Sequence, residues 1–145
     1  MPIYITLLSG EFLVLTLKGK FVAFAKNDCK QIAVFFNSDT TNGNYRYRRL
    51  LGDGSSASSL SGNFPYWFYM STTGDTASTF GNSEIYIPNY TSSANKSYSA
   101  DSVTENNGTT AFQTMTASLW SNTAAITSIK LTPELGSLVS GSTFS

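Results

Sequence analysis

The side chains that could carry acid–base chemistry in this sequence are nine carboxylates, because the chain contains no histidine. That absence excludes Ser-His-Asp and Cys-His catalysis and the usual zinc hydrolase sites. A glycosidase could still use two carboxylates that face one bond. Most of the acidic residues stand in turn contexts, where Asp is favoured for backbone hydrogen bonding. We therefore predict no catalytic residue; in the alternative, a glycan-cleaving enzyme, activity would depend on one of Asp39, Asp53, Asp75 and Glu84.

Metal and cofactor sites are not indicated either. Cys29 is the one cysteine, so neither an intrachain disulfide nor a thiolate cage can form. Asp39 or Asp53 could bind calcium together with loop carbonyls, but no EF-hand-like spacing supports this. Gly52-Asp53-Gly54 lacks the third glycine and the following helix of a dinucleotide fingerprint, and it indicates a turn. We expect no metal and no cofactor.

Two groups of residues are candidates for binding rather than catalysis. The aromatic run around Tyr66, Trp67 and Tyr69 could fill the core, form an intersubunit contact or stack against sugar rings. The three arginines Arg46, Arg48 and Arg49 could form an interface, or could lie on a solvated sheet face. We take these six residues as the candidate interface: Arg46, Arg48, Arg49, Tyr66, Trp67 and Tyr69.

Composition restricts the partners. Charged residues make up only 12% of the chain, and nine basic side chains balance nine acidic ones, so no overall field attracts nucleic acid or an anionic membrane. The apolar N-terminus lacks a basic region before it, carries Glu11, and is too short and interrupted to span a bilayer. We expect neither a nucleic-acid nor a membrane partner.

Alternation of apolar and polar residues indicates an almost entirely β fold. Residues 3–8 and 12–17 look like a hairpin, Lys18-Gly19-Lys20 like a turn, and 21–25 like a short third strand. Residues 31–37 form an apolar run suited to a buried strand. In 45–51, Tyr45 and Tyr47 share one face, while Arg46 and Arg48 share the other. Further strands are expected over 64–70, 84–90, 96–103, 112–120, 126–131 and 138–144.

Eight to ten short strands with such spacing predict one antiparallel β-sandwich over residues 1–145, with a jelly-roll-like connection order. The segments 52–62, 71–81 and 104–110 are expected to be loops. The aromatic content of 14% favours a folded core over disorder, despite the many Ser, Thr and Asn residues.

Several segments resemble a module that recurs in structural proteins of tailed phages. The resemblance is carried by Phe35-Phe36-Asn37-Ser38-Asp39-Thr40, by Asn44-Tyr45-Arg46-Tyr47 and by Gly52-Asp53-Gly54-Ser55-Ser56-Ala57. It continues through Glu84-Ile85-Tyr86-Ile87-Pro88-Asn89-Tyr90, through residues 119–129 and through the final residues 137–145. It covers residues 32–145, while the first 31 residues differ from the module's opening strands. The sequence ends where the module continues with Leu-Tyr-Gly, so the last strand of the sheet is expected to be incomplete.

The resemblance implies a non-enzymatic virion protein, made in the host cytoplasm and carried on the particle exterior. Fibres are usually long and repetitive, whereas this chain is short and has no repeat. A capsid decoration (cement) protein is therefore the leading hypothesis, docked on the major capsid protein or other virion proteins as a homo-oligomer, with a trimer expected. The alternative is a tail or fibre-tip component that binds a host surface glycan.

Overall fold

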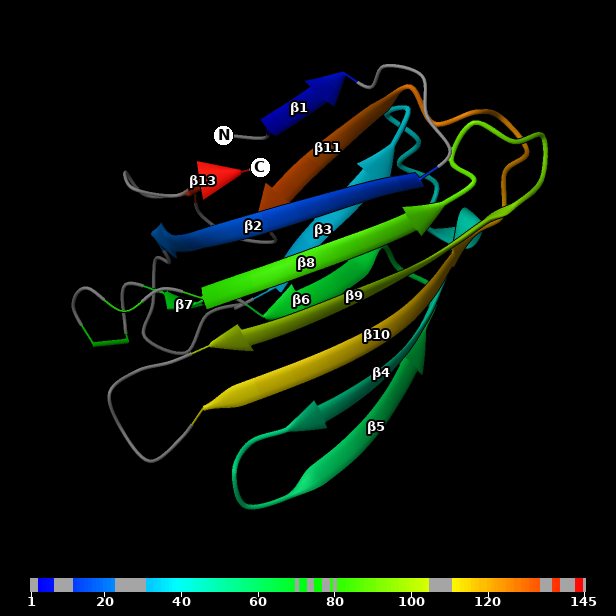
Figure 1. Ribbon diagram of the computed structural model, residues 1–145. Coiled ribbons are helices and arrows are strands. Elements are labelled where there is room, and N and C mark those ends of the chain that lie inside the picture. Colours follow the sequence, from blue (N-terminus) through cyan, green and yellow to red (C-terminus); the bar gives the residue numbers. More distant parts are fainter. Residues whose placement is uncertain are drawn as a thin grey trace.

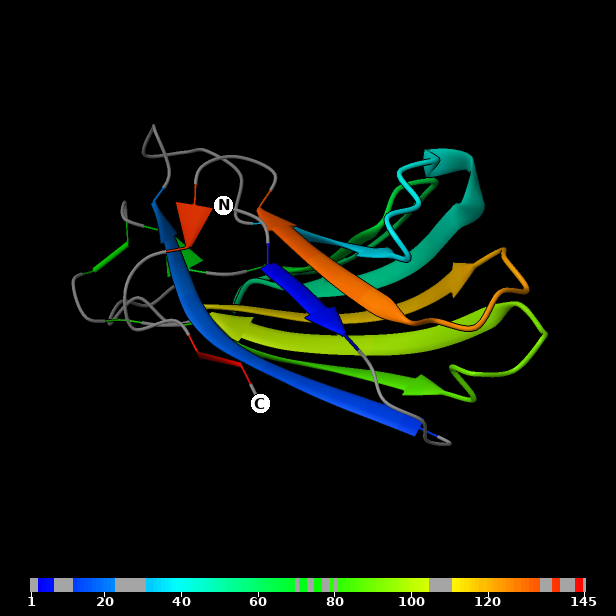
Figure 2. The same ribbon diagram turned by 90° about the horizontal axis from the view of Figure 1, so that it is seen from above.

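The computed structural model describes residues 3–6, 12–22, 31–69, 71–72, 75–76, 79, 81–104, 111–133, 137–138 and 143–144. Within them, two β-sheets pack against each other and one short 3₁₀ helix connects two strands (Figures 1 and 2). The predicted all-β sandwich is confirmed, while the jelly-roll connection order stays a prediction. The thirteen strands of the described residues exceed the eight to ten expected, and several of the additional ones are only two residues long.

The smaller sheet has four antiparallel strands in the order β1-β11-β3-β6. Their bounds are Ile3–Thr6 (β1), Ser128–Pro133 (β11), Gln31–Phe36 (β3) and Tyr66–Tyr69 (β6). The apolar run of β3 is buried as predicted, apart from the half-buried Gln31 and Phe35. Pro65 comes directly before β6, and β6 lies at the edge of this sheet, where a missing backbone N–H is tolerated.

The larger sheet follows the order β12-β2-β8-β9-β10-β4-β5, and β7 and β13 also pair with β2. Its six longer strands are Phe12–Val22 (β2), Gly81–Pro88 (β8), Lys96–Thr104 (β9), Phe112–Trp120 (β10), Tyr45–Gly52 (β4) and Ala57–Gly62 (β5). The short ones are Ser71–Thr72 (β7), Ser137–Leu138 (β12) and Thr143–Phe144 (β13). All these pairings are antiparallel except the parallel pair β2–β7.

Strict alternation in β4, β8, β9 and β10 separates an inner face from an outer face. Apart from the half-buried Leu51 and Phe112, every second residue of these strands is buried against the smaller sheet, and the residues between them are mostly exposed. Large aromatic side chains fill the space between the sheets. The ring of Phe36 lies 5.2 Å from that of Tyr98 in an edge-to-face arrangement and 5.4 Å from that of Trp120.

Two expectations for the N-terminal region are wrong. Strand β1 pairs with β11 in the smaller sheet and β2 pairs with β8 in the larger one, so residues 3–17 do not form a hairpin. Lys18-Gly19-Lys20 is not a turn, because β2 continues through it and Gly19 lies opposite Gly81 of β8. The partner strand therefore keeps this segment extended, although glycine weakens a strand on its own.

The connection between β3 and β4 begins at two residues with positive φ, Asn37 (51°) and Ser38 (60°). The side chain of Asn37 donates to the carbonyl of Ala125 (2.7 Å) and accepts from the backbone N–H of Thr127 (2.8 Å). Asn tolerates the left-handed conformation and can bond backbone groups from it. This one side chain therefore joins the turn after β3 to the segment that leads into β11, 88 residues away along the chain.

The expectation of a loop over residues 52–62 is wrong in its second half. Residues 53–56 form the turn of a hairpin, and Ala57–Gly62 is strand β5, paired with β4. Residues 71–72 and 81 also lie in strands, although a loop was expected there. Residues 105–110 and Cys29 lie outside the described part of the chain.

Candidate functional site: a groove on the outer sheet face

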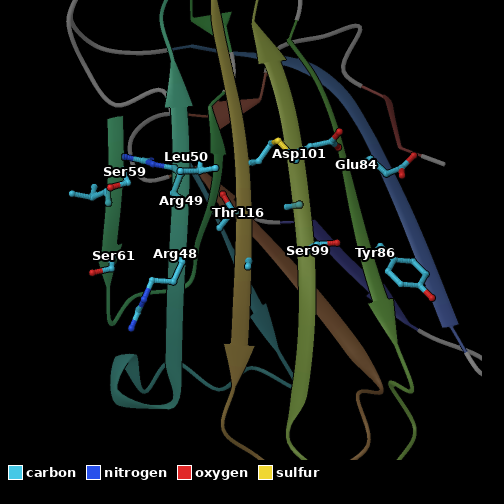
Figure 3. A pocket seen from close by; sticks show the side chains of 14 residues that line it. Arg48, Arg49, Leu50, Ser59, Ser61, Glu84, Tyr86, Ser99, Asp101 and Thr116 are labelled. Carbon is cyan, nitrogen blue, oxygen red and sulfur yellow. The ribbon is translucent and has the colours of Figure 1, made fainter. Parts of the chain in front are cut away.

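An open groove of about 690 Å³ crosses the outer face of the larger sheet (Figure 3). Strands β5, β4, β10, β9 and β8 all contribute to it. A second hollow, lined mainly by the ends of β4 and β5 near their connecting turn, shares Leu50, Ser59 and Met115 with the groove. The groove is thus built on strands of one sheet, which hold its side chains at fixed spacings.

The strand register places the lining residues in two rows across the sheet. One row runs Tyr86, Ser99, Ala117, Arg48 and Ser61. Ser99 and Ala117 are small, so they form the floor of the groove between the larger side chains of Tyr86 and Arg48. Tyr86 and Arg48 are three strand spacings apart, which corresponds to about 14 Å.

The second row runs Glu84, Asp101, Met115, Leu50 and Ser59. Its centre is apolar, because Leu50 and Met115 are neighbours that are 61% and 58% exposed. The ring of Tyr86, 42% exposed, lies on the next row. Side chains of this size are normally buried, so Leu50 and Met115 form an exposed apolar patch, while Tyr86 is separated from it by Ser99 and Asp101 of β9.

Two carboxylates meet at one end of the groove. Glu84 of β8 and Asp101 of β9 are direct cross-strand partners, and both side chains are exposed. Like charges that lie directly opposite each other destabilise a sheet. This pair could accept hydrogen bonds from hydroxyl groups of a ligand. The sequence marks Glu84 as a possible catalytic carboxylate but gives no sign of its pairing with Asp101, because only the register of β8 and β9 brings the two together.

The arginine cluster divides between the two faces of the sheet. Arg46 and Arg48 lie on the outer face, as predicted, and each donates to a backbone carbonyl, that of Gly43 (2.6 Å) for Arg46 and that of Tyr47 (2.9 Å) for Arg48. Of these two, Arg48 lines the groove and Arg46 does not. Their role at an interface stays a prediction.

The expectation that all three arginines lie outside the core is wrong for Arg49. It has the parity of Tyr45 and Tyr47, points to the inner face and is only 7% exposed. Its guanidinium carbon lies 5.0 Å from the centre of the Tyr69 ring, which stacks on Phe112. A cation above an aromatic face is stabilised by the ring quadrupole, which explains how this charge is accommodated.

Of the three aromatic candidates, Tyr69 is the one whose side chain the structure describes. Tyr69 is half-buried between Arg49 and Phe112, which indicates core packing rather than a sugar platform. Tyr66 and Trp67 belong to β6, but their side chains lie outside the described part of the structure. The aromatic residue that reaches the groove is Tyr86, which sequence reasoning did not single out.

Asp39 has a structural environment. Its carboxylate accepts from Trp120 Nε1 (2.8 Å), from Asn44 Nδ2 (2.8 Å) and from the Thr41 backbone N–H (2.9 Å). Burial acts to raise its pKa, but these hydrogen bonds outweigh it and hold the pKa below the usual value. All three donors come from the fold itself, so the carboxylate is occupied in holding β10 to the turn before β4.

Asp53 closes the β4–β5 hairpin. Its side chain accepts from the backbone N–H groups of Ser56 (2.7 Å) and Ser55 (2.9 Å). These bonds, together with those from the two serine hydroxyls, lower its pKa to about 2. The predicted turn role of this residue is therefore confirmed.

Among the residues described, no three of the side chains His, Cys, Asp and Glu come together in a way that could hold a metal ion. No helix in the described part of the chain is long and apolar enough to cross a membrane. Comparisons with protein-family models, with curated proteins and with solved structures found no match for this chain.

Proposed function

We propose that this chain is a non-enzymatic structural protein of a tailed-phage particle, carried on the particle exterior as a capsid decoration protein. The observation that supports this most is the outer face of the larger sheet, where exposed Leu50 and Met115 lie beside Arg48 and the exposed Tyr86 lies on the opposite side of the same groove. Aromatic residues, Met and Arg are enriched at protein interfaces. Covering such a patch on a capsid subunit would remove it from water, which is the main driving force of association.

The low charge of the protein suits this role. A chain with a formal net charge of zero is not repelled by further copies of itself on a crowded shell. The sequence resemblance over residues 32–145 supports the phage assignment, and the β-sandwich is an architecture compatible with it. The outer face is where we expect the capsid protein to dock.

The test is quantitative mass spectrometry of gradient-purified particles, with the copy number compared with that of the major capsid protein. Near-stoichiometric amounts are expected. A few copies per particle would instead indicate a tail component, and absence from particles would overturn both assignments.

A variant pair locates the docking face. Met115→Asp places a charge in the centre of the apolar patch, so the variant should be lost from particles while remaining folded by circular dichroism. Thr123→Asp, at an exposed site in the segment after β10, should be retained. Equal retention of both variants would contradict docking through the groove.

A second candidate function is binding of a host surface glycan by a tail or fibre tip. The specific observation in its favour is the groove itself, which combines the exposed ring of Tyr86 with hydrogen-bonding groups on Arg48, Glu84 and Asp101. A sugar ring has an apolar face that can stack on an aromatic ring, and hydroxyl groups that carboxylates and guanidinium groups can bind.

Glycan-array binding that is lost in Tyr86→Ala, and kept in Met115→Leu, would favour this second function. Trp67→Ala tests the aromatic run directly, since loss of binding there would move the site from the groove to β6. No binding to any glycan, combined with a near-stoichiometric copy number, would leave decoration as the function.

A further inference from the structure

We infer that strand β5 is a pairing edge at which two copies of this chain join, antiparallel to each other and about a twofold axis that passes through Leu60. In the described part of the structure β5 ends the larger sheet, and its one strand partner is β4 (Figure 1). A strand at the edge of a sheet presents unpaired backbone N–H and C=O groups, which another strand can complete.

The sequence of β5 has none of the usual protection against such pairing. Edge strands are normally blunted by charges, prolines or bulges. Ala57–Gly62 reads Ala-Ser-Ser-Leu-Ser-Gly, without charge or proline, and its six-residue register with β4 has no bulge. A partner strand can therefore approach along its whole length.

Exposure on both faces distinguishes β5 from its neighbours. The inner-facing residues of β4, β9 and β10 are buried except for the half-buried Leu51 and Phe112, but Leu60, which lies opposite the buried Arg49, is 52% exposed. Among the described residues, strand β6 of the smaller sheet packs mainly beneath β9 and β10 of the larger one. Exposure of this leucine on the inner side costs free energy in the single subunit. Its burial against a second copy would stabilise a pair.

The partner that fits is a second copy, because the strand is nearly palindromic about Leu60. Antiparallel pairing centred there places Leu60 opposite its own copy and Ser59 opposite the partner's Ser61. It also places Ser58 opposite the partner's Gly62. Leucine meets leucine, hydroxyl meets hydroxyl, small residues meet, and no like charges oppose each other. A twofold contact requires this kind of self-complementary surface.

This register also keeps the two outer faces on the same side. Residues opposite each other in an antiparallel pair point to the same face of the sheet. Ser59 and Ser61 both line the groove on the outer face, so their pairing would place the two grooves end to end across the axis. The ligand or capsid surface would then meet one continuous groove, and the assembly would be a dimer instead of the expected trimer.

The first experiment is disulfide cross-linking. In a Cys29→Ser background, Leu60→Cys brings two sulfurs together at the axis, where cross-strand Cβ atoms approach closely enough for a disulfide. Under mild oxidation this variant should form a covalent dimer at least about tenfold faster than the control Thr123→Cys, which is exposed but distant from β5. Equal rates for the two variants would overturn the inference.

The second experiment uses charge pairing and sedimentation. The wild-type protein should sediment as a dimer, while Leu60→Glu and Leu60→Lys should each sediment as monomers, because like charges then meet at the axis. Mixing the two variants should restore a dimer that contains one of each. Leu60 is exposed, so both variants are expected to fold, which circular dichroism checks. A wild-type protein that stays monomeric at high micromolar concentration, or a mixture that does not recombine, would refute the pairing.

Discussion

The phenol ring of Tyr47 lies directly over Gly62, its cross-strand partner on β5. A Cβ atom added to Gly62 would come within 2.8 Å of Cε1 and 2.9 Å of the hydroxyl oxygen of Tyr47. An aromatic ring over a glycine in a neighbouring strand covers the exposed backbone and helps to set the register. Tyr47 therefore helps to hold the β5 edge, which is otherwise almost fully exposed, to the rest of the sheet.

Gly62→Ala is expected to destabilise the fold by about 1–3 kcal/mol, because the Tyr47 ring must leave its position or strain the strand pair. Gly52→Ala is the matched control, since nothing lies within 4 Å of a Cβ at Gly52. Urea unfolding measures both. Equal free energies of unfolding for the two variants would show that the ring does not confine the glycine.

Asp39→Ala should cost about 3 kcal/mol, because it removes a charged acceptor and leaves the indole N–H of Trp120 without its partner in the interior. The near-isosteric Asp39→Asn should cost less, since its amide keeps one acceptor oxygen. Asp53→Ala, which removes a carboxylate from an exposed turn, is expected to destabilise less than Asp39→Ala. Unfolding monitored by tryptophan fluorescence suits this comparison, and the opposite order would contradict the structural role of Asp39.

The pH dependence of stability follows from the same carboxylate. The pKa of Asp39 in the fold lies below its ordinary value of 3.8, so ionisation of Asp39 stabilises the folded state relative to the unfolded state. Its contribution is complete above that ordinary pKa and is lost as the pH falls through the lower, folded pKa. In the wild type, the free energy of unfolding should therefore decrease as the pH is lowered below about 4.

Asp53, with a pKa of about 2, contributes to the pH dependence of stability over an overlapping pH range. The contribution of Asp39 is isolated by comparing variants. As the pH is lowered, the free energy of unfolding should decrease less in Asp39→Asn than in the wild type, with Asp53→Asn measured in parallel. Identical pH profiles for Asp39→Asn and the wild type would show that ionisation of Asp39 is not linked to folding.

The sequence predicts the alternation of side chains within strands better than the pairing between strands. The period of two in 45–51 places Tyr45 and Tyr47 inside and Arg46 and Arg48 outside, as observed. The same period already assigns Arg49 to the inner face, and the aromatic ring of Tyr69 that accommodates its charge comes from a distant strand. Strand β5 was missed because Ser, Gly and Ala have little β propensity, so its conformation depends on β4 and on the ring of Tyr47.

The groove could not be read from the sequence for a related reason. Its rows join residues from strands that are far apart in the chain, and a shift of register by one residue would send every side chain of a strand to the other face. Glu84 and Asp101 illustrate this, since nothing local to either residue indicates that they are neighbours. Turn chemistry is local, and so the role of Asp53 was predicted correctly.

The opposed carboxylates of Glu84 and Asp101 make a prediction that separates stability from binding. Asp101→Asn or Glu84→Gln should each raise the free energy of unfolding by about 0.2–1 kcal/mol, because like charges opposite each other destabilise a sheet. The double variant should gain little beyond either single one, since the first substitution already removes the repulsion. Added salt should reduce the gain, because it screens charges at an exposed site.

Thermal and urea unfolding at low and high salt measure these differences. Additive increases in the free energy of unfolding that do not depend on salt would contradict a direct repulsion between the two carboxylates. If the groove binds a glycan, Glu84→Gln should weaken that binding while it stabilises the fold, since a neutral amide is a weaker hydrogen-bond acceptor for hydroxyl groups than a carboxylate. If the groove is covered by a capsid subunit, the same variant should remain on particles at wild-type copy number, because Met115 and Leu50 supply the contact. The two proposed functions therefore predict different consequences of a single substitution.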